Sequence, residues 1–145
     1  MNNEMKVFLN ESLLKQDENQ DVVVENIYKA MLKTSKDSIN IDSDDIESLL
    51  QNQNNLFVGE GKSSSLSYAI TLAFKSQLFK EMNFKQVKTL LVKFHINSDI
   101  PFMDICNSMN DISENINDES DMIFGTFCDD SISKDEMKVI VMATF

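Results

Sequence analysis

The chain has 145 residues, of which 42% are hydrophobic, and this is enough apolar material to bury the core of one globular domain. Its 24 acidic residues outnumber its 13 basic residues, so the formal net charge at pH 7 is -11. A surface of this sign repels the phosphates of nucleic acids and of anionic membranes. We therefore expect neither nucleic acid nor a membrane surface as a direct partner.

The cysteines and the histidine do not form a metal or redox pattern. Cys106 and Cys128 lack the spacing of a zinc site or a redox pair, and His95 is the only histidine. We predict a structural role for His95 on a strand face. The sequence has no secretory leader and no run of about 18 apolar residues, so we expect a protein of the reducing cytoplasm.

The first fifty residues predict one short strand and two helices. The strand is Lys6 to Leu9. After the strand, apolar residues recur at i, i+3, i+4 and i+7, which is the spacing of one helix face. The residues of this first helix face are Val24, Ile27, Tyr28 and Met31. The second helix begins near Asp42 and ends at the amide-rich Gln51 to Asn55.

The middle of the chain continues with alternating strands and helices. Leu56 to Val58 is a short apolar run, and Ser63 to Ser65 then offer caps to a helix. The clearest strand is Thr89 to Ile96, in which every second residue is apolar. The helix that follows Ser65 is predicted to bury Leu66, Ala69, Ile70 and Ala73. Pro101 then opens a helix with an apolar stripe of Phe102, Ile105, Met109, Ile112 and Ile116.

Two final strands, Met122 to Phe127 and Met137 to Phe145, are separated by the acidic, turn-rich Asp129 to Glu136. That arrangement predicts a hairpin. The order of strands and helices along the chain predicts one mixed sheet with helices packed on it, in the α+β or α/β class.

Acidic groups converge in the stretch I-N-I-D-S-D-D-I, from Ile39 to Ile46. Asp42 or Ser43 can cap the helix that follows, and this structural role accounts for one short polar side chain. Asn40, Asp42 and Asp45 together present three polar groups where a loop enters a helix. Such a corner could also hold a water or a cation against a phosphate. We refer to these three residues as the Asn/Asp corner.

Calcium is the obvious competing ligand, because Asn40, Asp42 and Asp44 fall at positions one, three and five of an EF-hand loop. The glycine of such a loop is replaced by Asp45, and the closing glutamate is replaced by Gln51. The pattern therefore does not predict a calcium site.

Leu56 to Ser63 reads L-F-V-G-E-G-K-S and ends like a phosphate-binding P-loop, between a predicted strand and a predicted helix. The first glycine of that motif is missing, because its position holds Leu56. We expect Gly59 and Gly61 to lie in a turn instead, and a P-loop enzyme using Lys62 and Ser63 is the lesser alternative.

From Ile39 onward the order of segments resembles the C-terminal domain of FtsZ, the bacterial relative of tubulin. I-N-I-D-S-D-D-I is similar to the N-x-D-F-x-D-V corner of that family. The segments that follow it in the same order are the glycine-bearing strand Leu56 to Gly61, V-K-T-L-L-V-K-F-H-I, D-I-P-F, M-I-F-G-T and K-V-I-V-M-A-T-F.

The resemblance implies an α+β fold with a mixed four-stranded sheet and helices packed on it. It implies that residues 39–145 form the FtsZ-like C-terminal domain, and that residues 1–38 are a remnant strand and inter-domain helix. No glycine-rich GTP-binding loop is present in a sequence with 3 glycines, so we expect no cofactor on this chain and no GTPase activity from it alone.

In the family the corresponding corner of one subunit completes the GTP site of the next subunit in a filament. The resemblance therefore implies that Asn40, Asp42 and Asp45 are catalytic toward GTP and Mg²⁺ held by a neighbouring FtsZ-type subunit. It implies a cytoplasmic role in cell division at the septum, possible contacts with other division proteins, and no role for Asp44. A non-catalytic regulatory or scaffold domain acting through the acidic Asp129 to Glu136 is the alternative within the same fold.

Overall fold

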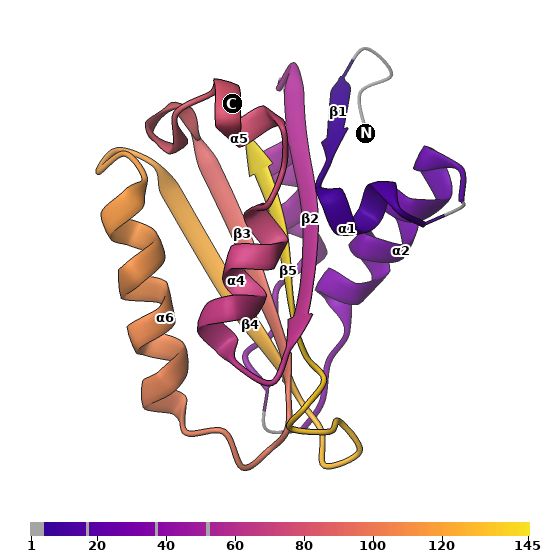
Figure 1. The fold of residues 1–145 in the computed structure, drawn as a ribbon, viewed down its shortest axis with the longest axis vertical. Coiled ribbons are helices and arrows are strands. Elements are labelled where there is room, and N and C mark those ends of the chain that lie inside the picture. Colours follow the sequence, from indigo (N-terminus) through magenta and orange to yellow (C-terminus); the bar gives the residue numbers. More distant parts are fainter. Residues whose placement is uncertain (1–4, 17, 37, 52) are drawn as a thin grey trace.

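One mixed sheet runs through the molecule (Figure 1). Its strands are β1 (Lys6–Leu9), β2 (Asn55–Ser63), β3 (Thr89–Ile96), β4 (Asp121–Cys128) and β5 (Met137–Thr144). They are ordered β1-β2-β5-β3-β4. β1 is parallel to β2 and β3 is parallel to β4, whereas β5 lies antiparallel between the two pairs. This computed structural model describes residues 5–16, 18–36, 38–51 and 53–145.

Helices cover both faces of the sheet. They are α1 (Glu11–Leu14), α2 (Gln20–Leu32), α3 (Ser43–Leu50), α4 (Leu66–Phe74), α5 (Leu78–Glu81) and α6 (Phe102–Asn115), with a 3-10 turn at Phe84–Gln86. Apolar residues of α4, α5 and α6 pack on one face, and those of α2 and α3 pack on the other. No helix of the described residues has both the length and the apolar character needed to cross a membrane.

The predicted fold class is confirmed, but the sheet has five strands instead of four. The additional strand is β1, in which Val7 pairs with Leu56 and Phe8 pairs with Phe57. α2 contributes Val23, Ile27 and Met31 to the core of the second face. The described part of residues 1–38 is therefore packed into the same sheet and core as the rest.

The predicted hairpin of the last two strands is wrong. β4 pairs with β3 at the edge of the sheet, and β5 crosses to the centre between β2 and β3. Burial explains the difference, because all of β5 except Lys138 is buried, whereas β4 begins with an exposed residue and three half-buried residues. A strand that is apolar on both sides is stable only where helices cover both faces.

The predicted helix stripes are largely confirmed. In α6 the residues Ile105, Met109 and Ile112, together with Ile116 just after it, are buried. Phe102 is an exception, since 56% of it is exposed at the first position of the helix. The stripe assigned by spacing thus begins one turn later, where the sheet lies beneath the helix.

His95 has the structural role that the sequence predicts. It is buried in β3, and its Nε2 lies 3.1 Å from the carbonyl oxygen of Ala30 in α2. Because a carbonyl can only accept, Nε2 carries the proton in this bond. The pKa of His95 is lowered to about 4, mainly because the side chain is buried. The hydrogen bond to Ala30 raises this pKa, whereas the positive charges of Lys138, Lys93 and Lys33 lower it.

Lys93 is the most unusual residue of the sheet. It is fully buried at the centre of β3, beside Gly125 of β4 and Ile140 of β5. Its Nζ has no hydrogen-bond partner among the described residues. Burial lowers the pKa of Lys93, and the nearby Cys128 acts in the opposite direction. An ammonium in this position is desolvated without compensation.

We predict that Lys93→Met raises the free energy of unfolding at pH 7 by about 1 to 2 kcal/mol, because a side chain of similar shape replaces an unpartnered buried amine. Urea denaturation monitored by circular dichroism measures this change. The control is Lys88→Met at an exposed position, which we expect to change stability little. A less stable Lys93→Met protein would mean that the amine has a stabilising partner.

We predict that His95 destabilises the fold at acidic pH. Its folded pKa of about 4 lies below the ordinary histidine pKa of 6.5, so between these two pH values the unfolded chain binds a proton that the folded chain does not. The free energy of unfolding therefore falls as the pH drops from 6.5 toward 4, in total by about 3 kcal/mol. The measurement is the difference between wild type and His95→Gln across this range, since carboxylates common to both cancel. Parallel pH profiles would contradict the prediction.

Candidate functional site

The Asn/Asp corner forms the start of α3. Asp42 is the N-cap residue, and its Oδ1 accepts a hydrogen bond from the Asp44 backbone N–H at 2.9 Å. Asp45 Oδ2 in turn accepts from the Asp42 backbone N–H at 3.4 Å, which completes a capping box. The structural role expected for this stretch is thus confirmed for Asp42, and Asp45 shares it.

The residues of the corner differ in burial from Ile41, which lies between two of them and anchors the segment. Ile41 is buried, whereas Asn40 and Asp42 on either side of it are exposed. Asp45 is half-buried and lines a hollow of about 290 Å³ between α3 and the first residues of β3 and β4. Hydrogen bonds therefore bring Asp42 and Asp45 together, while Asn40 lies beside them without a bond to either carboxylate among the described residues.

Gly125 of β4 makes room for the corner, and no sequence motif pointed to this. A Cβ at Gly125 would come within 2.7 Å of Ile41 Cγ1 and within 2.8 Å of the Ile39 carbonyl oxygen. Only a residue without a side chain lets the Ile39 backbone and the Ile41 side chain lie this close to the sheet. The contact joins residues that are far apart in sequence, so periodicity could not have found it.

The chemistry available at the corner is that of oxygen acceptors. Each bond of the capping box uses one carboxylate oxygen, and the remaining lone pairs of Asp42 and Asp45 can accept hydrogen bonds from water. The partial positive charge at the start of α3 favours negative charge on both side chains. Among the described residues there is no cluster of three or more His, Cys, Asp or Glu side chains that could hold a metal ion.

The P-loop alternative is wrong, and so is the predicted turn at Gly59 and Gly61. Both glycines lie within β2, which continues through Lys62 to Ser63 and pairs with β5 along this length. An extended strand cannot converge its backbone N–H groups on a phosphate. A Cβ at Gly59 or Gly61 would instead collide with the backbone of α4, so these glycines allow that helix to lie on the strand.

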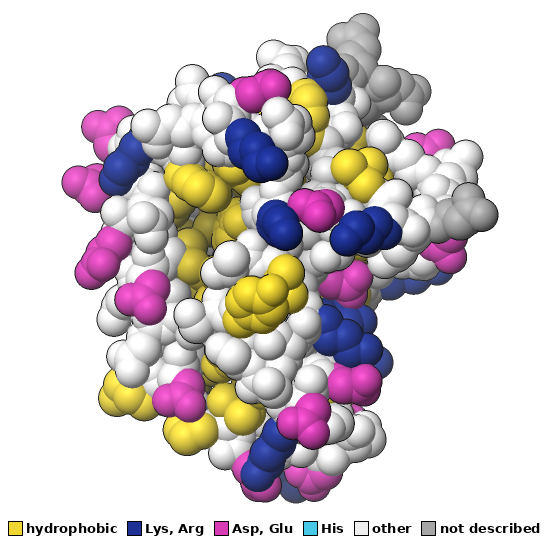
Figure 2. Space-filling view, in the orientation of Figure 1, with side chains coloured by type: hydrophobic (Ala, Val, Ile, Leu, Met, Phe, Trp, Pro, Cys, Tyr) yellow, Lys and Arg dark blue, Asp and Glu magenta, His cyan; other side chains and the backbone are white. Residues whose placement is uncertain are grey.

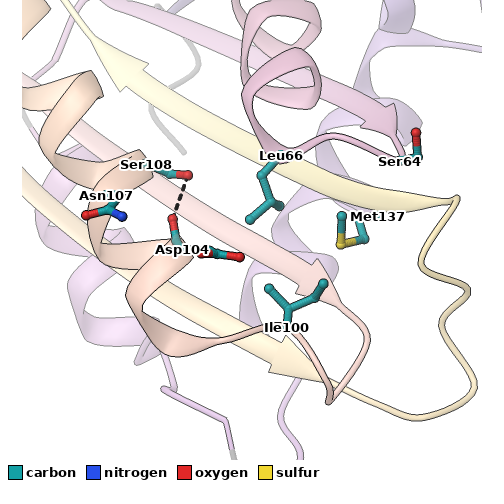
Figure 3. A pocket seen from close by; sticks show the side chains of 7 residues that line it. All are labelled: Ser64, Leu66, Ile100, Asp104, Asn107, Ser108 and Met137. Carbon is teal, nitrogen blue, oxygen red and sulfur yellow. Dashed lines mark hydrogen bonds between the residues drawn. The ribbon is translucent and has the colours of Figure 1, made fainter.

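A second hollow, of about 310 Å³, lies between α4 and α6. Figure 2 shows hydrophobic side chains in the depth of the molecule there, with acidic side chains along the α6 edge. Among the described residues, Asp104 is the only titratable one that lines it, and the Ser108 hydroxyl donates to the Asp104 carbonyl oxygen at 2.9 Å (Figure 3). The described part of the lining contains no acid pair and none of the residues of the Asn/Asp corner.

Three comparisons with known proteins agree with one another. A family model described as the FtsZ family, C-terminal domain, matches residues 53–145. The cell division protein FtsZ of Helicobacter pylori is 26% identical over 114 residues, which cover 77% of this chain and 30% of that protein. The chain thus spans about a third of the length of this curated relative.

Solved structures share the fold. An FtsZ dimer from M. jannaschii has a TM-score of 0.67 at 17% identity, covering 96% of this chain and 45% of that chain. A GTPγS-form protofilament of TubZ from Bacillus thuringiensis serovar israelensis has a TM-score of 0.64 at 18% identity. The match covers 86% of this chain and 34% of the TubZ chain. The family match begins at residue 53, after the Asn/Asp corner, so the role of Asn40, Asp42 and Asp45 stays a prediction.

We predict that Asp42→Ala lowers the free energy of unfolding by about 1 kcal/mol, because it removes the N-cap of α3. Asp42→Asn should lower the free energy of unfolding by only about a few tenths of a kcal/mol, since asparagine caps about as well as aspartate. Asp44→Ala, at the exposed neighbouring position, is the matched control for loss of charge. Urea denaturation separates the three, and equal stability of Asp42→Ala and wild type would exclude the cap as a stabilising contact.

Proposed function

Because the chain belongs to the FtsZ family, whose C-terminal domain it matches over residues 53–145, we propose that it completes a GTP-hydrolysis site carried by a neighbouring FtsZ-type subunit. The residues that would do so are Asn40, Asp42 and Asp45. The observation that carries this proposal is the exposure of Asn40 and Asp42 on either side of the buried Ile41, at a helix start that holds Asp42 and Asp45 in one capping box.

The corner would act by orienting the water that attacks the terminal phosphate. Carboxylate oxygens accept hydrogen bonds from water, and the Asn40 amide can accept one or donate one. Hydrolysis of a phosphoanhydride depends mainly on positioning and on neutralising charge, and this chain would supply the positioning. The capping box favours this task, because it restricts the side chains of Asp42 and Asp45 before any partner arrives.

Charge neutralisation would come from the partner. Two carboxylates facing a triphosphate would repel it, and Mg²⁺ bound with the partner's nucleotide would supply the positive charge that offsets this repulsion. Oxygen ligands suit Mg²⁺, and the described residues offer no cluster of three that could hold the ion alone, so the nucleotide-bearing partner would supply most of its ligands. The same relationship leads us to propose that the chain acts in the cytoplasm at the division septum, with FtsZ-type subunits as partners.

A complementation assay tests the proposal. The partner is Helicobacter pylori FtsZ in which the aspartates of its own corresponding corner are changed to alanine, so that it binds GTP but cannot complete a site. We expect addition of this chain to raise GTP turnover about tenfold or more, as is usual when a group that activates water is restored. Asp42→Asn and Asp45→Asn should abolish the increase while keeping the capping box.

Asp44→Asn is the matched control, since it removes one charge from the same helix turn and should keep full turnover. Turnover that is unchanged by Asp42→Asn and Asp45→Asn would overturn the proposal. If both variants still bound the partner, that result would favour the non-catalytic scaffold instead.

A further inference from the structure

The edge of β4 is held by the residues that lead into the Asn/Asp corner. The Cys128 backbone N–H donates to Ser38 Oγ at 3.0 Å, and Ser35 Oγ donates to the Cys128 carbonyl oxygen at 2.8 Å. The Thr126 backbone N–H donates to the Ile39 carbonyl oxygen at 2.8 Å. We call Ser35, Ser38 and Ile39 the edge clasp. These bonds satisfy outward-facing backbone groups of a strand that, in the part of the chain that the structure describes, has no strand neighbour on that side.

Thr126 makes the contact nearest to the corner. Besides the bond from its backbone, its Oγ1 accepts a hydrogen bond from the Ile39 backbone N–H at 2.9 Å. Thr126 is 3% exposed, so its hydroxyl is shielded from competing water. Both polar groups of the Ile39 backbone are therefore held by Thr126, and Ile39 directly precedes Asn40.

The other side of Asn40 is held as well. Ile41 is 2% exposed and lies over Gly125, the residue before Thr126. Asn40 thus lies between Ile39, whose backbone is bound to Thr126 while its side chain is 37% exposed, and the buried Ile41, which packs over Gly125. The backbone at Asn40 has little freedom to turn as long as both contacts persist.

We propose that Thr126 is a positioning residue for the Asn/Asp corner, whose hydroxyl fixes the backbone at Ile39 and thereby aims Asn40 at the nucleotide of the neighbouring subunit. This inference rests on the proposed function. Because Thr126 is 3% exposed, it would act through Ile39 and not by touching the nucleotide itself. Its effect should appear in the rate of the chemical step, because displacement of a positioning group by about 1 Å can reduce a rate on the order of a hundredfold.

The test uses Thr126→Val, which replaces the hydroxyl with a methyl group of the same shape, and Thr126→Ser, which restores the hydroxyl. The matched control is Thr144→Val, since Thr144 is a fully buried threonine whose Oγ1 has no hydrogen-bond partner among the described residues. Each variant is titrated into the complementation assay at a temperature where circular dichroism shows that it is folded. Maximal turnover and the chain concentration at half-maximal turnover are both recorded.

We expect Thr126→Val to lower maximal turnover about tenfold or more without a comparable change in the half-maximal concentration. Thr126→Ser should return maximal turnover to within about twofold of wild type, and the maximal turnover of Thr144→Val should match wild type. Equal losses in Thr126→Val and Thr144→Val, or no loss in either, would overturn the inference. If Asp45→Asn abolishes turnover while Thr126→Val does not, the positioning role fails and the proposed function stands. If Asp45→Asn has no effect, the proposed function fails.

Hydrogen exchange provides a second measurement that does not depend on the partner. The Ile39 amide should be protected in the wild-type chain and in Thr126→Ser, and should exchange faster in Thr126→Val. An Ile39 amide that exchanges in wild type at the rate of an unstructured peptide would overturn the inference, even if Thr126→Val did not fold.

Discussion

The rest of the structure depends on the pairing of β5 with both β2 and β3. β5 is the antiparallel strand that joins two parallel pairs, and its register runs from Met137 opposite Ser63 to Thr144 opposite Leu56. Only Lys138 in this strand is not buried. Burial on both sides places the strand at the centre, and each layer of helices then covers one of its faces.

That central pairing determines where the Asn/Asp corner can lie. With β5 beside β3, the other side of β3 is left for β4, which becomes the edge of the sheet. The edge clasp bonds to this strand, and Ile41 occupies the space above Gly125. The corner lies at the start of α3 in the sequence. Its position relative to the sheet, however, is set by β4, in which Thr126 lies 87 residues after Ile39.

The same two carboxylates serve the helix and the proposed chemistry. Asp42 and Asp45 close the capping box, and this is why a purely structural interpretation of the sequence was sufficient for them locally. A capping box leaves lone pairs on each carboxylate, so the two roles are compatible. The membership of the chain in the FtsZ family favours the second role, and the exposure of Asn40, which no cap requires, is in keeping with it.

Sequence alone was enough for the features that depend on a few neighbouring residues. The Asp42 and Ser65 caps, the apolar stripes of α2 and α6, and the presence of a strand at β3 follow from side-chain chemistry and periodicity. Tertiary structure decided the features that depend on which strands are neighbours. Gly59 and Gly61 admit α4 instead of bending the chain, β5 leaves β4 for the centre, Thr126 holds Ile39, and Lys93 is enclosed. The physical reason is that strand order is chosen by the burial of both sheet faces over the whole chain, whereas a cap or a stripe is chosen within one or two turns.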